Sequence, residues 1–239
     1  TFEVLDFEGK LVAIFYSDFF PRKGKRNGAW MTSFKPQYIK DRVNERPHVS
    51  IVCNFTPPTG TKPSLLTFNE VTTLFHEFGH ALHGMLANTT YQSLSGTSVF
   101  WDFVELPSQV MENWCYQPEA LALFAHHYET GEVIPQHYVE KIKESASFLE
   151  GMATLRQLSF GILDMEYHAQ VTEIKEIKAF EKQAMEIATL YPDVEDNCMS
   201  VSFSHIFQGG YSSGYYSYKW AEVLDADAFA YFEEQGIFN

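Results

Sequence analysis

TFNEVTTLFHEFGHALHGML, residues 67–86, is the most informative segment of this 239-residue chain. Its first four residues, 67–70, have the Ser/Thr-x-x-Glu form of a capping box, which predicts a helix start just ahead of Val71. Apolar residues recur behind it at helical spacing, whereas His76 and His80 lie one turn apart on the opposite side. We expect the apolar stripe to pack on a core and the two histidines to face elsewhere.

The same segment contains the HExxH pattern at residues 76–80. Two imidazoles at i and i+4 can bind one Zn²⁺, while the glutamate beside the first histidine reaches a metal-bound water. The metzincin continuation needs Gly at position 83 and His at position 86, but the chain has His83 and Leu86, so that class is excluded. His83 lies about 10 Å along the helix axis from His76, too far to share the metal.

A catalytic zinc needs a third protein ligand, and Glu105 in WDFVELPSQ is the best candidate because apolar residues surround it. Burying a carboxylate there is costly unless a cation compensates. Pro107 fixes the backbone nearby by starting or kinking a helix. Ser108, Gln109 and Glu112 follow on the same helical face and are candidates for hydrogen bonds to metal-bound imidazoles. The alternative is that Glu105 and Glu112 are ordinary solvent-facing acids.

A third region, SHIFQGGYSSGYYSYKW at residues 204–220, is rich in glycine, serine and tyrosine. Gly209 and Gly210 permit positive φ and close backbone approach. Phenols here can donate hydrogen bonds to a peptide carbonyl or an oxyanion, and they belong to Tyr211, Tyr215 and Tyr218. We interpret the region as a mobile substrate loop; the alternative is a flexible loop that leads into an aromatic core helix.

Composition limits the classes of protein that fit. A hydrophobic content of 45% supports a packed core and excludes disorder as the main interpretation. Acidic residues outnumber basic ones by 31 to 17, so we expect no nucleic-acid partner. Apolar runs fall far short of the roughly 18 residues that a membrane span needs, so we expect no membrane contact. Three scattered cysteines indicate reduced thiols, and we expect a cytoplasmic protein.

The secondary-structure signals divide the chain into two parts. Residues 1–68 are predicted to be mainly β, with a hairpin formed by 1–6 and 10–17, a strand at 48–55 and one more short strand at 64–68. From residue 69 onward helical periodicity takes over. The sequence therefore predicts an α+β fold that is predominantly helical: a small N-terminal β-sheet followed by a helical body, together forming a single domain over residues 1–239.

Taken together, these segments resemble the thimet oligopeptidase family of zinc peptidases, and most closely its bacterial oligopeptidase A branch. The blocks that carry the resemblance are GAWM at 28–31, VCNF at 52–55, TLFHEFGHALHGML at 73–86, FVELPSQVMENW at 103–114, HYETGEVIP at 127–135 and SHIFQGGYSSGYYSYKW at 204–220. The resemblance implies a zincin-type catalytic domain that holds one Zn²⁺. Because family members are much longer, it also implies that the chain is a fragment of a longer protein.

The resemblance assigns roles to residues of this chain. His76 and His80 match the zinc-binding histidines, Glu105 the third ligand and Glu77 the general base. Positions that grip the substrate and help to stabilise the tetrahedral intermediate are matched by His205, Tyr211, Tyr215 and Tyr218, beside the glycines Gly209 and Gly210. Tyr218 is the preferred oxyanion donor, with Tyr215 as the alternative.

The implied function is a zinc-dependent endopeptidase that hydrolyses short oligopeptides through a metal-bound water activated by Glu77. Short peptides are then the expected partners, and a monomer is the expected state. Two alternatives stay open. A peptidyl-dipeptidase (dipeptidyl carboxypeptidase) would need a cation for the free C-terminal carboxylate, and the sequence does not show whether Arg22, Lys23 or another side chain supplies it. A non-catalytic peptide-binding module would use zinc for structure alone.

Overall fold

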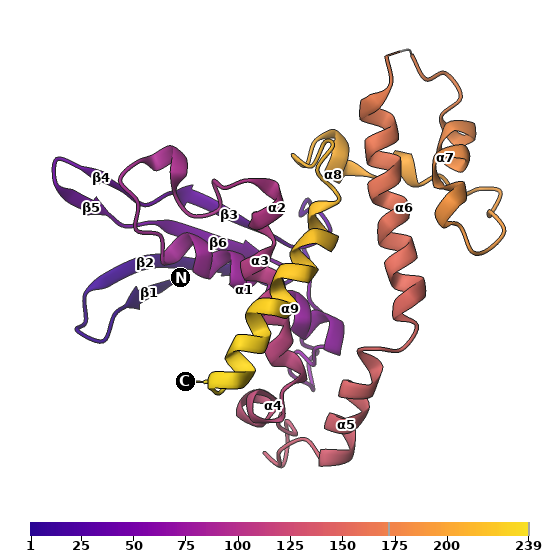
Figure 1. The fold of residues 1–239 in the computed structure, drawn as a ribbon. Helices are drawn as coiled ribbons and strands as arrows, with labels where there is room; N and C mark the ends of the chain where they lie inside the picture. Colours follow the sequence, from indigo (N-terminus) through magenta and orange to yellow (C-terminus); the bar gives the residue numbers. More distant parts are fainter. Residues whose placement is uncertain (172, 239) are drawn as a thin grey trace.

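The computed structural model describes residues 1–171 and 173–238, with a small sheet at one end and helices over the rest (Figure 1). Strands β1, β2, β6 and β3 form a four-stranded sheet in that order, and β4 and β5 form a separate two-stranded ribbon. The strands are β1 (Phe2–Leu5), β2 (Leu11–Asp18), β3 (Trp30–Lys35), β4 (Tyr38–Lys40), β5 (Val43–Glu45) and β6 (His48–Val52).

The predicted hairpin is confirmed, since β1 and β2 pair antiparallel. The Asp6 carboxylate accepts hydrogen bonds from the backbone N–H groups of Glu8 and Lys10 at 3.0 and 2.9 Å, which closes the turn. The predicted strand at 64–68 is wrong. Phe68 already begins a helix there, because Thr67 serves as its N-cap.

Helices follow the sheet along the chain, as predicted. They are α1 (Phe68–Met85), α2 (Trp101–Val104), α3 (Leu106–Glu112), α4 (Pro118–Phe124), α5 (Gln136–Ser145), α6 (Glu150–Ala169), α7 (Ile177–Met185), α8 (Ser204–Phe207) and α9 (Ser217–Gln235). Short 3₁₀ turns lie between them: η1 (Gln92–Leu94), η2 (Asn113–Tyr116), η3 (Glu186–Ala188) and η4 (Met199–Val201). Of the helices in the described ranges, none is both long enough and apolar enough to cross a bilayer.

Helix α1 begins with the predicted capping box. The Thr67 hydroxyl accepts the Glu70 N–H at 3.3 Å, and the Glu70 carboxylate accepts the Thr67 N–H at 2.7 Å. The other Glu70 carboxylate oxygen accepts the N–H of Thr56 at 2.6 Å, which ties the end of the sheet region to the helix start. The first turn of α1 is therefore fixed by its own sequence and by the preceding loop.

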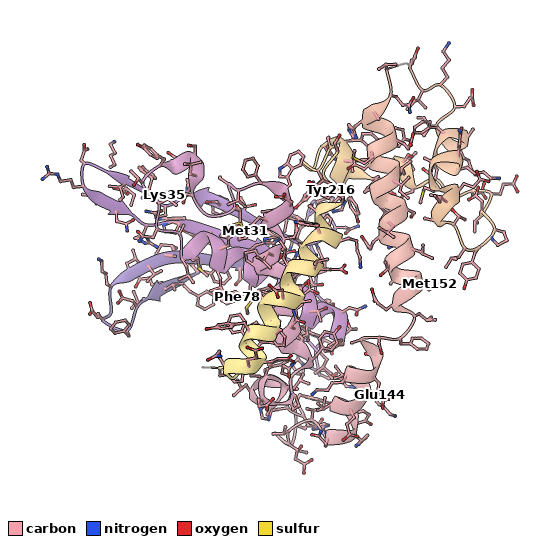
Figure 2. The ribbon with its side chains drawn as sticks, viewed as in Figure 1. Met31, Lys35, Phe78, Glu144, Met152 and Tyr216 are labelled. Carbon is pink, nitrogen blue, oxygen red and sulfur yellow. The ribbon has the colours of Figure 1, made fainter. Side chains whose placement is uncertain are left out.

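Two hydrophobic cores hold the site elements. The first joins α1 to the sheet and consists of Ala13, Phe15, Val49, Ile51, Ala81 and Met85. Phe78 and Met31, labelled in Figure 2, pack against it. The second joins α6 to the segment that contains α8 and consists of Phe160, Leu163, Phe203, Ile206 and Tyr215. In Figure 1, α8 lies beside the upper part of α6, so the second core attaches residues 204–220, the tyrosine-rich loop, to α6.

Candidate active site

Helices α1 and α3 pack closely because residue 79 is glycine. A Cβ at Gly79 would lie 2.3 Å from the backbone oxygen of Pro107. Glu105 ends α2 and precedes α3, whose first turn contains Pro107, a residue suited to a helix start. The close packing brings Glu105 against the side of α1 that carries His76 and His80.

Three donor groups converge at this junction. Glu105 Oε2 lies 3.3 Å from His76 Nε2 and 3.1 Å from His80 Nε2, and one ligand atom from each of the three residues lies within 4.8 Å of the others. A tetrahedral zinc ion with bonds of about 2.0–2.2 Å would separate its ligand atoms by about 3.3–3.5 Å. Donor chemistry and spacing therefore fit one zinc ion with two nitrogen ligands and one oxygen ligand.

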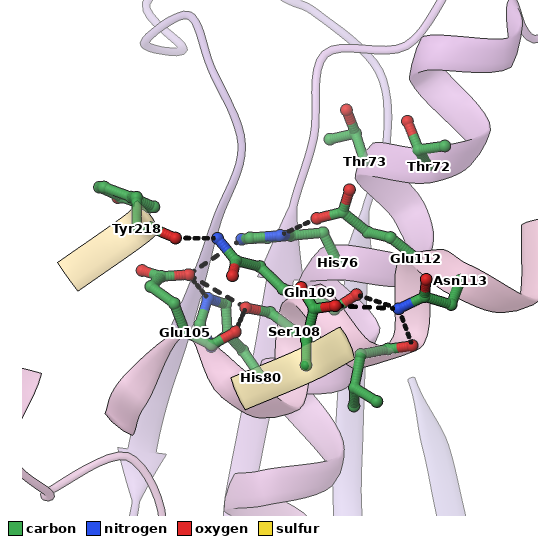
Figure 3. A network of polar contacts seen from close by, with 12 residues as sticks. Thr72, Thr73, His76, His80, Glu105, Ser108, Gln109, Glu112, Asn113 and Tyr218 are labelled. Atoms are coloured by element: carbon green, nitrogen blue, oxygen red, sulfur yellow. Dashed lines mark hydrogen bonds and ion pairs between the residues drawn. The ribbon is translucent and has the colours of Figure 1, made fainter. Parts of the chain in front are cut away.

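Of the three candidates for contacts with the imidazoles, only Glu112 makes one (Figure 3). Its Oε1 lies 2.6 Å from His76 Nδ1. A proton held on Nδ1 by this carboxylate leaves the Nε2 lone pair for a metal. Gln109 instead donates from Nε2 to the backbone oxygen of Tyr218 at 3.0 Å, which links α3 to the start of α9.

Glu105 itself is buried and hydrogen-bonded through both carboxylate oxygens. Ser108 Oγ donates to Oε2 at 3.0 Å. The hydroxyl of Tyr211 donates to Oε1. The structure therefore places Tyr211 on the carboxylate of the candidate metal ligand, a contact that the sequence analysis did not foresee. With both oxygens held, the orientation of the carboxylate is fixed before any ion binds.

Burial and charge act in opposite directions on the ionisable groups. Burial disfavours the charged form of Glu105, but the hydrogen bonds with His76 and His80 outweigh it and hold the pKa of this carboxyl well below its usual range. Burial would also lower the pKa of His76, but hydrogen bonds with Glu105 and Glu112 raise it to about 10. A positive charge at this position is therefore strongly favoured, as it would be for a bound cation.

Glu77 lies beside the cluster in a different environment. Burial raises the pKa of its carboxyl and outweighs the nearby imidazoles of His76 and His80, which act in the opposite direction. Its Oε2 is buried and has no hydrogen-bond partner among the described residues. An unpaired buried carboxylate oxygen is costly, and such groups concentrate at functional sites.

The cluster opens into a cavity of about 550 Å³. Its lining includes His76, Glu77, His80 and Glu105 and four more of the predicted residues: His205, Gly209, Tyr211 and Tyr218. The structure does not bring Gly210 or Tyr215 into this lining. Tyr215 is buried in the second core, where its hydroxyl donates to Gln157 Oε1 at 3.1 Å.

The protonation states of the lining groups suit hydrogen-bond donation. Burial raises the pKa of the Tyr218 hydroxyl, and the negative charge of Glu105 raises it further, so the phenol keeps its proton. Burial lowers the pKa of His205, which favours the neutral imidazole. Tyr218 is also in side-chain contact with Tyr211, whose ring centroid lies 5.2 Å away in a stacked arrangement.

Arg26 is a residue of the cavity that the sequence did not single out. It is the only lysine or arginine in the cavity lining formed by the described residues. Its guanidinium carbon lies 4.9 Å from the centroid of the Trp30 ring. By contrast, Arg22 pairs with Asp18 at 2.6 Å.

Comparisons with known proteins agree with this arrangement. The model of peptidase family M3 matches residues 1–239, and the chain belongs to that family, which confirms the resemblance drawn from the sequence. It is 46% identical over 242 residues to oligopeptidase A of Escherichia coli (strain K12) and 44% identical over 245 residues to a probable cytosolic oligopeptidase A of Arabidopsis thaliana. It is 38% identical over 239 residues to dipeptidyl carboxypeptidase of Escherichia coli (strain K12).

These alignments cover almost the whole chain but only part of each relative. They take in 100%, 98% and 99% of this chain, and 36%, 34% and 35% of the respective relatives. The chain thus spans about a third of the length of the proteins it matches.

Proposed function

We propose that the chain carries the active site of a zinc-dependent endopeptidase that hydrolyses short oligopeptides. The observation that carries the proposal is the convergence of His76, His80 and Glu105 beside Glu77 in one cavity. The names of the oligopeptidase A relatives support short peptides as substrates. A single zincin-type catalytic domain, a cytoplasmic location and a monomeric state belong to the same proposal.

His76 and His80 would hold the zinc ion through Nε2, and Glu105 would hold it through Oε2. When bound, zinc acts as a Lewis acid that lowers the pKa of water toward neutrality and polarises a carbonyl. Ser108 and Tyr211 would keep the Glu105 carboxylate in position, and Glu112 would keep the proton of His76 on Nδ1.

Glu77 would act as the general base and then as the general acid. Its unpaired Oε2 is available to take a proton from the attacking water. Because burial raises the pKa of this carboxyl, the protonated form is favoured after the transfer, and it would return the proton to the leaving amine of the peptide.

Tyr218 would donate a hydrogen bond to the oxyanion that forms on the scissile carbonyl. Tyr211 holds Glu105 and Tyr215 bonds to Gln157, whereas Tyr218 lines the cavity with Tyr211 as its hydrogen-bonding neighbour. His205 lines the same cavity and would assist as a neutral donor. Loss of one oxyanion donor typically lowers kcat by roughly 10²–10³-fold, so Tyr218→Phe is expected to fall in that range.

A peptidyl-dipeptidase is the second candidate, because Arg26 provides a cation in the cavity. A free C-terminal carboxylate is the group such a cation would bind. The similarity to dipeptidyl carboxypeptidase is consistent with this alternative. Matched peptides with free and amidated C-termini separate the two activities: an endopeptidase cleaves both, whereas a peptidyl-dipeptidase cleaves only the free form.

The Glu77→Gln variant tests the enzymatic proposal. It is expected to retain one zinc per chain and to lose peptide hydrolysis, because the amide cannot accept the proton. Glu222→Gln, at a carboxylate on α9 that pairs with Lys219, is the matched control and should keep activity. Substantial hydrolysis by Glu77→Gln would contradict the base role. Wild-type protein that binds peptides but releases no product would support the peptide-binding module instead.

A further inference from the structure

Asp164 is a fully buried carboxylate on α6. It accepts hydrogen bonds from the backbone of the tyrosine-rich loop (residues 204–220), and among the described residues it pairs with no basic side chain of that loop. Its Oδ1 accepts the backbone N–H of Ser213, and its Oδ2 accepts the backbone N–H of Tyr215, both at 2.9 Å. His168, one turn further along α6, places Nδ1 2.9 Å from Oδ1. A carboxylate with no exposure is stable only while such partners stay in place.

The loop backbone is shaped to receive this carboxylate. Ser213 has φ of +56°, the left-handed conformation, so that alternate N–H groups point to the same side. Gly214 passes directly over Trp101, since a Cβ there would lie 2.2 Å from Trp101 Cε3. The loop therefore contacts both Asp164 and Trp101.

Along the chain, the loop residues that bond to Asp164 lie between the two tyrosines whose phenols reach the candidate active site. Tyr211 precedes Ser213 by two residues and holds Glu105, whereas Tyr218 follows Tyr215 by three residues and lines the cavity. Tyr215 itself packs in the second core with a ring centroid 5.0 Å from that of Tyr218. A shift of the backbone at 213–215 would displace both phenols.

We propose that Asp164 is a positioning residue of the active site: its carboxylate fixes the backbone at Ser213 and Tyr215 so that Tyr211 and Tyr218 keep their places at Glu105 and in the cavity. The catalytic consequence rests on the proposed function. The attachment itself does not, because it is a property of the loop that exists without substrate.

Glu181 provides a matched control on the neighbouring helix α7. It is also a buried carboxylate that accepts two backbone N–H groups, those of Met199 and Ser200, at 2.8 and 2.7 Å. It holds η4 and, among the described residues, makes no hydrogen bond or ion pair with the tyrosine-rich loop. Asp164→Asn and Glu181→Gln therefore remove the same kind of interaction at two places, one attached to the loop and one not.

Hydrogen exchange of the zinc-loaded protein tests the attachment without any need for activity. Asp164→Asn is expected to speed amide exchange across residues 211–217 by at least about tenfold, because an asparagine has only one acceptor oxygen for two N–H groups. Glu181→Gln is expected to speed exchange at 199–201 and to leave 211–217 unchanged. Unaltered exchange at 211–217 in Asp164→Asn would overturn the proposal.

Peptide hydrolysis by the same proteins tests the consequence. Asp164→Asn is expected to lower kcat by about 10–100-fold with KM changed less than about threefold, because misplaced donors affect the transition state more than substrate binding. In a Tyr218→Phe background the same substitution should cost less, since one of the two phenols that Asp164 positions can no longer donate. Equal losses of kcat for Asp164→Asn and Glu181→Gln, or full additivity with Tyr218→Phe, would overturn the positioning role.

Failure of the proposed function gives a different result from failure of the Asp164 proposal. If the zinc-loaded wild-type protein cleaves no peptide, the endopeptidase proposal is wrong. In that case the exchange measurement alone judges Asp164: faster exchange at 211–217 supports the attachment, and unchanged exchange overturns it.

Discussion

Replacement of Glu112 by glutamine is expected to weaken zinc binding about tenfold. The carboxylate lies 2.6 Å from His76 Nδ1, a distance typical of a charge-assisted hydrogen bond, which contributes about 1.5–3 kcal/mol. The Glu112 side chain is 36% exposed, so solvent screens part of this and the lower end applies. Because about 1.4 kcal/mol corresponds to a factor of ten, Glu112→Gln should raise the Kd for zinc roughly tenfold.

The assay is competition for zinc between the protein and a chelator of known affinity, followed by a change in the chelator's absorbance. Circular dichroism of each variant establishes that it is folded. Glu222→Gln is the control, since its carboxylate pairs with Lys219 and not with a histidine of the cluster. A Kd for Glu112→Gln within about twofold of the wild type would refute the reasoning, as would an equal weakening in the control.

Three further predictions concern packing, pH and substrate charge. Gly79→Ala should lower the free energy of unfolding by more than about 1 kcal/mol, because its Cβ would meet the Pro107 backbone oxygen at 2.3 Å. Urea melts measure this loss of stability, and an unchanged midpoint would contradict the prediction. Burial raises the pKa of Asp225 to about 6 from an ordinary 3.8, so the folded protein loses stability as pH rises from about 4 to about 6. Asp225→Asn should therefore stabilise the metal-free protein by about 1–3 kcal/mol at pH 7 and have no effect below about pH 4. Thermal melts in which the substitution changes the Tm equally at both pH values would exclude this prediction. Arg26→Ala should weaken the binding of peptides with a free C-terminus about tenfold and leave the binding of amidated peptides unaffected, provided that Arg26 binds the terminal carboxylate. Equal changes in binding for both peptides would exclude that role.

Local patterns were sufficient to predict the candidate metal centre. The capping box set the start of α1, and helical periodicity then put His76 and His80 one turn apart. Glu105 was identified because a carboxylate among apolar residues needs a compensating partner, and the structure places it within 3.3 Å of both imidazole Nε2 atoms. Each of these inferences depends on residues that are close in sequence or on a single burial argument.

Contacts through the backbone could not be predicted in the same way. Asp164 binds N–H groups 49 and 51 residues away, and a backbone N–H carries no sequence signal. Tyr215 was grouped with Tyr211 and Tyr218 because all three lie in one loop, but the left-handed Ser213 breaks any regular spacing there. Consequently the sequence could not show which phenols face the cavity and which one, Tyr215, turns into the second core.

The zinc content of folded, gel-filtered protein, measured by plasma mass spectrometry, tests the proposed metal ligands most directly. We expect about one zinc per wild-type chain and much less than one in a Glu105→Ala variant that remains folded, with Glu222→Ala retaining the wild-type value. A folded wild-type chain that stays metal-free after incubation with excess zinc, or a Glu105→Ala variant that binds zinc as tightly as the wild type, would contradict the assignment of His76, His80 and Glu105 as the metal ligands.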